Sequence, residues 1–240
     1  MAKKVKGETA RTTLEGVNDS LTSLEQKFEK NKKYIYWALG IICAVALAIL
    51  AYVYLIMKPA KENDRIATSK ADMALFDQGK SEEALKQYQS IANNSSYASA
   101  DRAAHMAAIL LYQDALKQTD AKKANQNYQK AASLLERCSA NGNLIGPAAK
   151  SLLGDCYVNL KQYDKALGAF DEAIKISKDN KEYAPEFILK KARVLHATKN
   201  YKGEAEAYQL LKDEYPQAGQ MFNVNIDKYL ERAKALAGQE

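Results

Sequence analysis

The sequence predicts an all-α protein with a single transmembrane helix near its N-terminus, then a solenoid of about four helix pairs and a C-terminal capping helix. Three observations support this fold class. An uncharged apolar run fills residues 34–57, and apolar residues recur at helical spacing through the rest of the chain. Glycine and proline are scarce, at 11 and 4 of 240 residues, which excludes an all-β protein rich in turns. We therefore expect an arm over 1–33, a membrane helix over 34–57 and a repeat domain over 58–240.

The apolar run reads YIYWALGIICAVALAILAYVYLIM and contains no charged side chain. As a helix it would extend roughly 36 Å, enough to cross a hydrocarbon core of about 30 Å with some tilt. Its aromatic residues lie near the two ends, as expected at the level of the lipid headgroups: Tyr34, Tyr36 and Trp37 at one end, Tyr52 and Tyr54 at the other. A signal peptide would have a shorter apolar region ending at small residues, whereas this run ends in Leu-Ile-Met-Lys-Pro. We expect residues 34–57 to anchor the chain in the lipid bilayer.

Flanking charge predicts the orientation of this helix. The positively charged residues closest to its two ends are Lys27, Lys30, Lys32 and Lys33 on the N-terminal side and Lys58, Lys61 and Arg65 on the C-terminal side. Further basic residues in the arm increase this difference, so the positive-inside rule predicts a cytoplasmic N-terminus and an extracytoplasmic repeat domain. Residues 58–240 contain 27 basic and 24 acidic side chains, interspersed, which does not indicate a nucleic-acid-binding face.

The arm has a heptad-like pattern of apolar residues between Leu14 and Phe28. Thr12 and Glu15 have the spacing of a capping box, which predicts a helix start near residue 12. Three interpretations remain open: docking on the inner leaflet or on a partner, a helical extension of the membrane span, and a short coiled coil. The last is disfavoured because two heptads are marginal in water.

One stretch of the repeat domain has a recognisable motif, L-G-x-x-Y followed by a small residue, an aromatic residue and another small residue. Its members are Leu153, Gly154, Tyr157, Ala166, Phe170 and Ala173. This pattern resembles the tetratricopeptide repeat, which implies two antiparallel helices over about 147–180. Small residues would lie where the helices cross, and the aromatic rings would fill the space around the crossing. Lys150 and Lys178 depart from the family pattern, which has Trp and Pro there.

The second-helix half of this motif recurs at intervals of 38 to 42 residues, around Tyr88, Tyr128 and Tyr208. In the last copy Glu204 stands where the others have Ala, so we expect that pair to pack more loosely. A final helix over about 218–237 would cap the stack, because the open end of a solenoid needs a cover.

The sequence contains no pattern that indicates catalysis. His105 and His196 are far apart and lack metal-ligand spacing, and no glycine-rich phosphate loop is present. Cys138 and Cys156 could be buried thiols or, in an oxidising compartment, a disulfide. We therefore expect a non-enzymatic binding protein without a metal or cofactor.

Stacked repeats usually bind partners on the face formed by the first helix of each pair. On that face we predict Ser151, Asp155, Asn159, Leu189, Arg193 and His196 as partner-binding candidates. Some cytosolic repeat proteins bind a C-terminal carboxylate through basic and Asn residues, which would fall at Ser151 and Asp155 here. Neither residue fits, so the sequence argues against that ligand at these positions.

The run SLEQKFEKNKKYIYWALGIICAVALAILAYVYLIM and the exit KPAKENDRIATSKADMALFDQGKSEEALKQY resemble the ancillary SecYEG translocon subunit family, the YfgM-like proteins. The resemblance implies a single-pass protein of the bacterial inner membrane with periplasmic repeats. Its implied partners are the Sec translocon, emerging secreted chains and periplasmic chaperones such as a membrane-anchored prolyl isomerase. One alternative is a structural scaffold of an envelope or cell-division complex. Another is an enzyme regulator or a cytosol-facing organelle adaptor, which requires the opposite topology.

Overall fold

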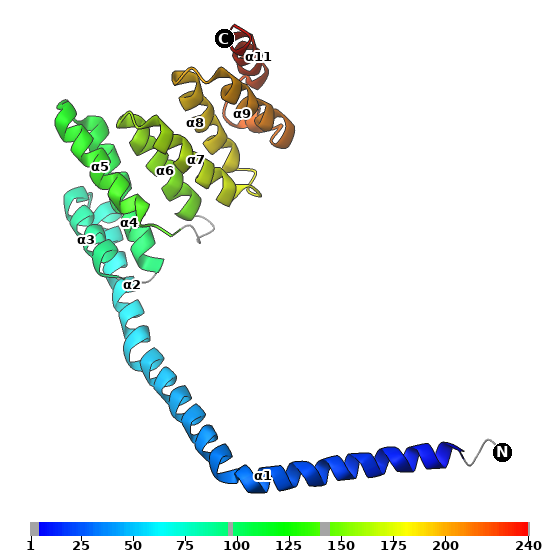
Figure 1. Ribbon diagram of the computed structural model, residues 1–240. Helices are drawn as coiled ribbons and strands as arrows, with labels where there is room; N and C mark the ends of the chain where they lie inside the picture. Colours follow the sequence, from blue (N-terminus) through cyan, green and yellow to red (C-terminus); the bar gives the residue numbers. More distant parts are fainter. Residues whose placement is uncertain (1–4, 96–97, 140–144, 240) are drawn as a thin grey trace. The chain divides into compact units, whose positions relative to one another are not determined.

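The computed structural model describes residues 5–95, 98–139 and 145–239, with side chains from Glu29 onward except Ala98. Every regular element in these residues is helical, and none is a strand. The chain forms two compact units, Met1–Ala60 and Lys61–Glu240. The all-helical prediction is confirmed, and each unit is described by itself below (Figure 1).

The first unit contains α1 (Val5–Tyr52) and the π-helical turn η1 (Val53–Met57). The helix begins at Val5, so the expected start near residue 12 is wrong. Glu8, Ala10 and Arg11 precede the Thr12–Glu15 pair and are good or adequate helix formers, so the helix continues upstream. Within the described residues, one helical run, Glu29–Asp77, is long and apolar enough by length and composition to cross a membrane. Its large apolar side chains, such as Trp37 and Leu55, are exposed.

The second unit is a succession of helices that pack mainly on their neighbours in the chain. Its elements are α2 (Lys58–Asp72, from Lys61 onward), η2 (Met73–Asp77), α3 (Ser81–Asn94), α4 (Ala98–Lys117), α5 (Ala121–Glu136), α6 (Ile145–Asn159), α7 (Tyr163–Ser177), α8 (Ala184–Ala197), α9 (Tyr201–Glu214), α10 (Ala218–Met221) and α11 (Ile226–Ala237). Contacts follow the order α3–α4, α4–α5, α5–α6, α6–α7, α7–α8, α8–α9 and α9–α11, which is the arrangement of an α-solenoid (Figure 1).

Two of the turns between paired helices have the same backbone geometry. The turns α6–α7 and α8–α9 place Lys161 and Lys199 in the left-handed region, with φ of 60° and 62°. In both turns the next residue donates its backbone N–H to a carbonyl five positions earlier, at 2.8 Å and 2.9 Å, which satisfies a free helix-end carbonyl. The Asn200 side chain then accepts from the Gly203 N–H at 2.9 Å and caps α9. These two pairs therefore use the same turn, 38 positions apart.

The pair α6–α7 is built around a close crossing. Gly154 lies against Phe170, and a Cβ added at Gly154 would stand 2.5 Å from the ring. Leu153, Tyr157, Ala166 and Ala173 are also buried at this crossing. Lys150, where the family pattern has Trp, bonds Glu172 on α7 at 2.6 Å, so an ion pair joins the two helices there.

The expected single C-terminal helix over 218–237 is wrong, because the chain forms α10, a break at residues 222–225, and then α11. Asn223 adopts φ 50°, and the Asn225 side chain accepts from the Lys228 N–H at 2.9 Å. Asparagine favours both the left-handed region and the N-cap, so this sequence ends one helix and starts another. Ile226, Leu230 and Ala233 of α11 are buried, as a capping helix requires.

The hydrophobic core consists of two clusters. The first cluster extends from Ala71 to Phe170 and includes Val194, and the second extends from Ala184 to Leu230. They meet at the α7–α8 junction, where the partly buried Leu167 packs against both. Alanine makes up much of the first cluster, which allows the helices to approach closely.

Candidate functional site

The first helices of successive pairs form one face of the repeat unit, which we call the inner face. α4 contacts α6 directly, although α5 lies between them in the chain. Two cavities lie along this face, one lined from α2, α4 and the start of α6, and the other lined mainly from α8, α9 and α11. The second helices α3 and α5 line a separate outer-face hollow rich in Gln and Asn.

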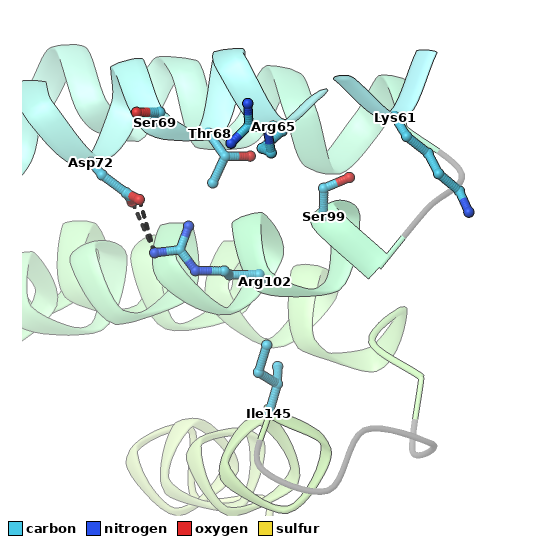
Figure 2. Close-up of a pocket in the computed structure, with 8 residues that line it drawn as sticks. All are labelled: Lys61, Arg65, Thr68, Ser69, Asp72, Ser99, Arg102 and Ile145. Atoms are coloured by element: carbon cyan, nitrogen blue, oxygen red, sulfur yellow. Dashed lines mark hydrogen bonds and ion pairs between the residues drawn. The ribbon is translucent and has the colours of Figure 1, made fainter. Parts of the chain in front are cut away.

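The cavity at the α2 end has a volume of about 700 Å³, and two of its lining cations, Arg65 and Arg102, form ion pairs within the protein. Figure 2 shows Arg102 of α4 pointing at Asp72 of α2, with Nη2 3.0 Å and 3.1 Å from the two carboxylate oxygens. Tyr88 donates its hydroxyl to the same carboxylate at 2.5 Å. Burial, reinforced by the Asp72 carboxylate, raises the pKa of Tyr88. These contacts hold α2, α3 and α4 together.

Lys190 of α8 occupies the middle of the inner face. Its Nζ lies 3.0 Å from Ser151 Oγ and 2.7 Å from Asp155 Oδ2, both on α6. Burial raises the pKa of the Asp155 carboxyl, and the Lys190 ammonium acts in the opposite direction. The side chains of Ser151 and Asp155 therefore already have a hydrogen-bond partner, Lys190.

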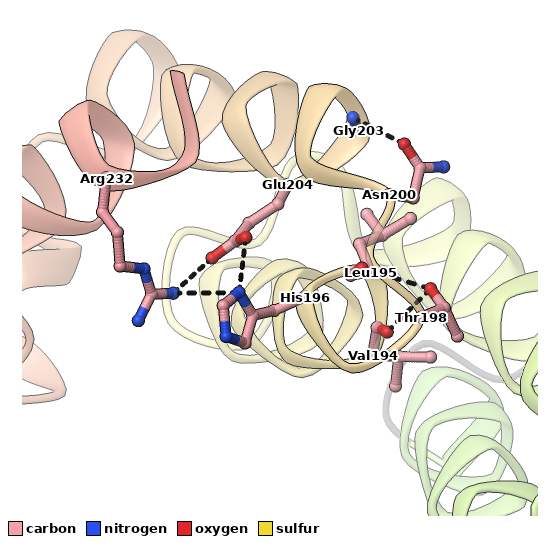
Figure 3. A network of polar contacts seen from close by, with 8 residues as sticks. All are labelled: Val194, Leu195, His196, Thr198, Asn200, Gly203, Glu204 and Arg232. Carbon is pink, nitrogen blue, oxygen red and sulfur yellow. Dashed lines mark hydrogen bonds and ion pairs between the residues drawn. The ribbon is translucent and has the colours of Figure 1, made fainter. Parts of the chain in front are cut away.

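The second cavity, which we call the terminal cavity, has a volume of about 210 Å³. Its lining residues are Leu189, Arg193, His196, Glu204, Tyr208, Val224, Tyr229 and Arg232. Glu204 of α9 is fully buried and bonds Arg232 of α11 at 2.5 Å and His196 Nδ1 of α8 at 2.8 Å. Figure 3 shows these three side chains converging from three helices.

Aromatic rings form one wall of the terminal cavity. The Tyr208 and Tyr229 rings stack with centroids 5.6 Å apart and an interplanar angle of 15°. The Arg232 guanidinium lies 4.7 Å from the Tyr229 ring centroid, within the range of a cation–π contact. Burial raises the pKa of the Tyr208 hydroxyl.

The structure separates the six predicted partner-binding residues into two groups. Leu189, Arg193 and His196 line the terminal cavity together. The other three lie on α6. Ser151 and Asp155 bond Lys190, and Asn159 donates to Tyr112 Oη at 3.3 Å and to the Asp155 carbonyl at 2.9 Å.

Sequence reasoning missed Arg232, Lys190 and the bonds that Glu204 makes. Glu204 is a departure from Ala, and the α8 and α9 backbones approach each other less extensively than those of α6 and α7, as expected for the looser pair. Its carboxylate is nevertheless fully enclosed and joins three helices. Arg232 follows Glu204 by 28 positions, so no local spacing pairs the two. Its only sequence signal is its place one turn after Tyr229 on the capping helix.

The cysteines of the repeat unit are free thiols with little reactivity expected. Burial raises the pKa of the Cys138 thiol to about 11 and that of the Cys156 thiol to about 12. We predict that maleimide modifies neither thiol appreciably in the native protein at mildly alkaline pH, and that both react rapidly in urea. Mass spectrometry of the labelled peptides measures this. Rapid native labelling of either residue would contradict the burial.

Within the described residues, no group of three or more His, Cys, Asp or Glu side chains could hold a metal ion. The inner face instead offers charged, hydroxyl and aromatic side chains around two cavities. Such a surface is suited to binding through hydrogen bonds, ion pairs and apolar contacts.

Comparison with known proteins gives one family match, to the tetratricopeptide repeat, over residues 147–180. This is the range predicted from the L-G-x-x-Y motif, and it corresponds to α6 and α7. No curated protein sequence matches the chain. Among solved structures, the chain is similar to two of a Podosopora anserina putative kinesin light chain with nearly identical TPR-like repeats. One of the two carries a single Gln-to-Met substitution.

Both structures share 14% sequence identity with this chain, and in each the match covers 73% of it. For the substituted variant the TM-score is 0.44 with 94% of that chain covered, and for the other structure it is 0.43 with 95% covered. The helix order and the repeat match together describe a tetratricopeptide-like α-solenoid that follows an apolar N-terminal helix.

Proposed function

We propose that this chain is a non-enzymatic, membrane-anchored adaptor whose inner face binds protein partners. The observation that carries the proposal is the terminal cavity, because three of the residues predicted for partner binding line it together. Tetratricopeptide repeats typically act as protein-interaction scaffolds, and the match over 147–180 supports the same role here. The apolar helix would fix this binding surface beside a bilayer.

We further propose that residues 1–33 are cytoplasmic, that residues 34–57 span the bacterial inner membrane, and that residues 58–240 are periplasmic. In this arrangement the inner face meets the Sec translocon, emerging secreted chains or a periplasmic chaperone. The support is the resemblance of the juxtamembrane sequence to YfgM-like proteins and the excess of Lys and Arg before the span.

Site-specific photo-crosslinking in bacterial cells tests the adaptor role. A photoreactive residue at Asn159 or Arg193 probes the inner face, and one at Gln126 on the outer face is the matched control. We expect crosslinks to a Sec channel subunit or a periplasmic folding factor from the inner face only. Crosslinks mainly to cell-wall or outer-membrane assembly factors would favour the envelope scaffold instead. Equal crosslinking from Gln126 would contradict an inner-face binding site.

Topology is tested with Lys130→Cys, which places a thiol at an exposed position on α5. We expect a membrane-impermeant maleimide to label this variant in intact bacterial spheroplasts, because the repeat domain would lie outside the cytoplasm. The parent chain is the control, since Cys138 and Cys156 are buried and Cys43 lies within the apolar run. Labelling that requires lysis would place the repeat domain in the cytoplasm.

A further inference from the structure

The terminal cavity contains a buried charge that the fold alone does not require. Ala stands at the equivalent position of the earlier pairs, at 84, 124 and 166, whereas Glu204 introduces a carboxylate with no solvent exposure. A buried carboxylate is costly unless it is fully paired. Here it bonds Arg232 and His196, so its main structural effect is to hold these two side chains at the cavity wall.

Arg232 retains capacity for another acceptor. One of its terminal nitrogens donates to Glu204, and its face lies over the Tyr229 ring. Its buried Nε has no hydrogen-bond partner among the described residues. Because buried donors are normally satisfied, this nitrogen marks a place where an acceptor is missing.

Arg193 adds a second guanidinium to the same cavity. It lies three positions before His196 on α8, so both side chains share one face of that helix. It is exposed and forms no ion pair or hydrogen bond with any residue that the structure describes. The nearby Asp155 carboxylate forms its ion pair with Lys190, not with Arg193. Burial raises the pKa of the Asp155 carboxyl, and the positive charge of Arg193 acts in the opposite direction.

The cavity therefore has a net positive charge next to apolar walls. Two guanidinium groups face one carboxylate, which gives an excess of one positive charge even when His196 is neutral. Leu189, Val224 and the stacked tyrosine rings supply apolar surface. Arginine binds a planar carboxylate through two parallel N–H donors, and the adjacent walls can accept an aliphatic or aromatic side chain.

We propose that the terminal cavity binds the side-chain carboxylate of an Asp or Glu in an extended partner segment, with an apolar residue beside it. Arg193 is the principal ligand of that carboxylate, and Arg232, positioned by Glu204, is a second donor. The volume of about 210 Å³ is suited to a short stretch of side chains, and the partner segment continues along the inner face toward α6. This inference rests on the proposed role of the inner face in binding protein partners.

A randomised peptide library provides a direct test. The peptides are acetylated and amidated, so that only side chains carry carboxylates, and they are selected on the full-length protein in lipid nanodiscs. We expect enrichment of Asp and Glu next to Leu, Ile, Val, Phe or Tyr, read by mass spectrometry. Arg193→Gln should reduce the affinity of the selected peptides at least about tenfold, the effect of one charge-assisted hydrogen-bonded pair.

Three comparisons make this result decisive. Lys130→Gln removes one positive charge from the outer face and should leave the selection unchanged. Arg193→Lys keeps the charge without the paired donors and should give an intermediate affinity. Replacing Asp by Asn in a selected peptide should weaken its binding to the parent chain more than its binding to Arg193→Gln, where Arg232 is the remaining donor. Far-UV circular dichroism should show the same helix content in Arg193→Gln, Arg193→Lys and Lys130→Gln as in the parent chain.

The inference is overturned if acidic residues are not enriched, or if Arg193→Gln selects them as well as the parent chain does. Selection only from a library with free C-termini would also overturn it, because the bound carboxylate would then belong to the main chain. The adaptor proposal fails separately. If the purified chain selects acidic segments but inner-face crosslinks are absent in cells, the cavity assignment stands and the adaptor role does not.

Discussion

Replacing Arg232 with Leu should lower the free energy of unfolding by about 3 kcal/mol, because it leaves the fully buried Glu204 carboxylate without its guanidinium partner. The substitution leaves the fully buried Glu204 carboxylate with His196 as its remaining charged or polar contact. Urea denaturation of the full chain in mild detergent, followed by far-UV circular dichroism, measures the change. Arg193→Leu is the matched control, because Arg193 is exposed, and it should shift stability by less than about 0.5 kcal/mol.

The double variant Glu204→Ala/Arg232→Leu distinguishes a lost ion pair from lost packing. It removes both charges and restores at position 204 the small residue of the earlier pairs. We expect it to recover about 2 kcal/mol relative to Arg232→Leu alone, since neutral or stabilising effects are common when a whole buried pair becomes apolar. A double variant as unstable as the single one would show that Arg232 acts through its packing on Tyr229.

Gly154→Ala should destabilise the repeat unit by about 2 kcal/mol, although Ala is the better helix former. The new methyl group would stand 2.5 to 2.8 Å from three atoms of the Phe170 ring, which is itself buried. The ring can relieve this overlap only by displacing its neighbours in the first core cluster. The same urea denaturation measures the loss.

Gly168→Ala is the matched control for this substitution. Gly168 lies in α7, is exposed, and a Cβ there would meet nothing within 4 Å. Only the gain in helix propensity remains, so stability should rise by about 0.5–1 kcal/mol. A comparable increase for Gly154→Ala would mean that the α6–α7 crossing has more room than the structure gives it.

The strongest repeat copy could be predicted because its signals are local. The motif from Leu153 to Ala173 places small and aromatic residues at fixed intervals within one helix pair, and the family match covers the same 147–180 range. Turn chemistry was harder to recognise. The Asn223 and Asn225 signals interrupt a pattern that otherwise reads as one continuous helix, so two helices were predicted as one.

The terminal cavity could be predicted only in part. Leu189, Arg193 and His196 lie on one helix at helical spacing, so a position-based argument finds all three. Glu204 and Arg232 belong to other helices, and their pairing depends on how α9 and α11 pack. A buried acid is visible in a sequence only as a departure from a pattern. Whether the buried acid separates the paired helices or joins them depends on an ion-pair partner that the pattern does not identify.

The division of the core into two clusters limits how far the stabilising effect of a bound partner would spread along the chain. Core clusters that meet at the α7–α8 junction can open as separate cooperative segments, each with its own free energy of opening. The terminal cavity belongs to the segment built on the second cluster. A bound segment would therefore slow amide exchange in α8, α9 and α11 while leaving exchange in α3 to α5 almost unchanged. Occupancy of the terminal cavity would stay a local event, and α3 to α5 would remain free to engage a different partner at the same time.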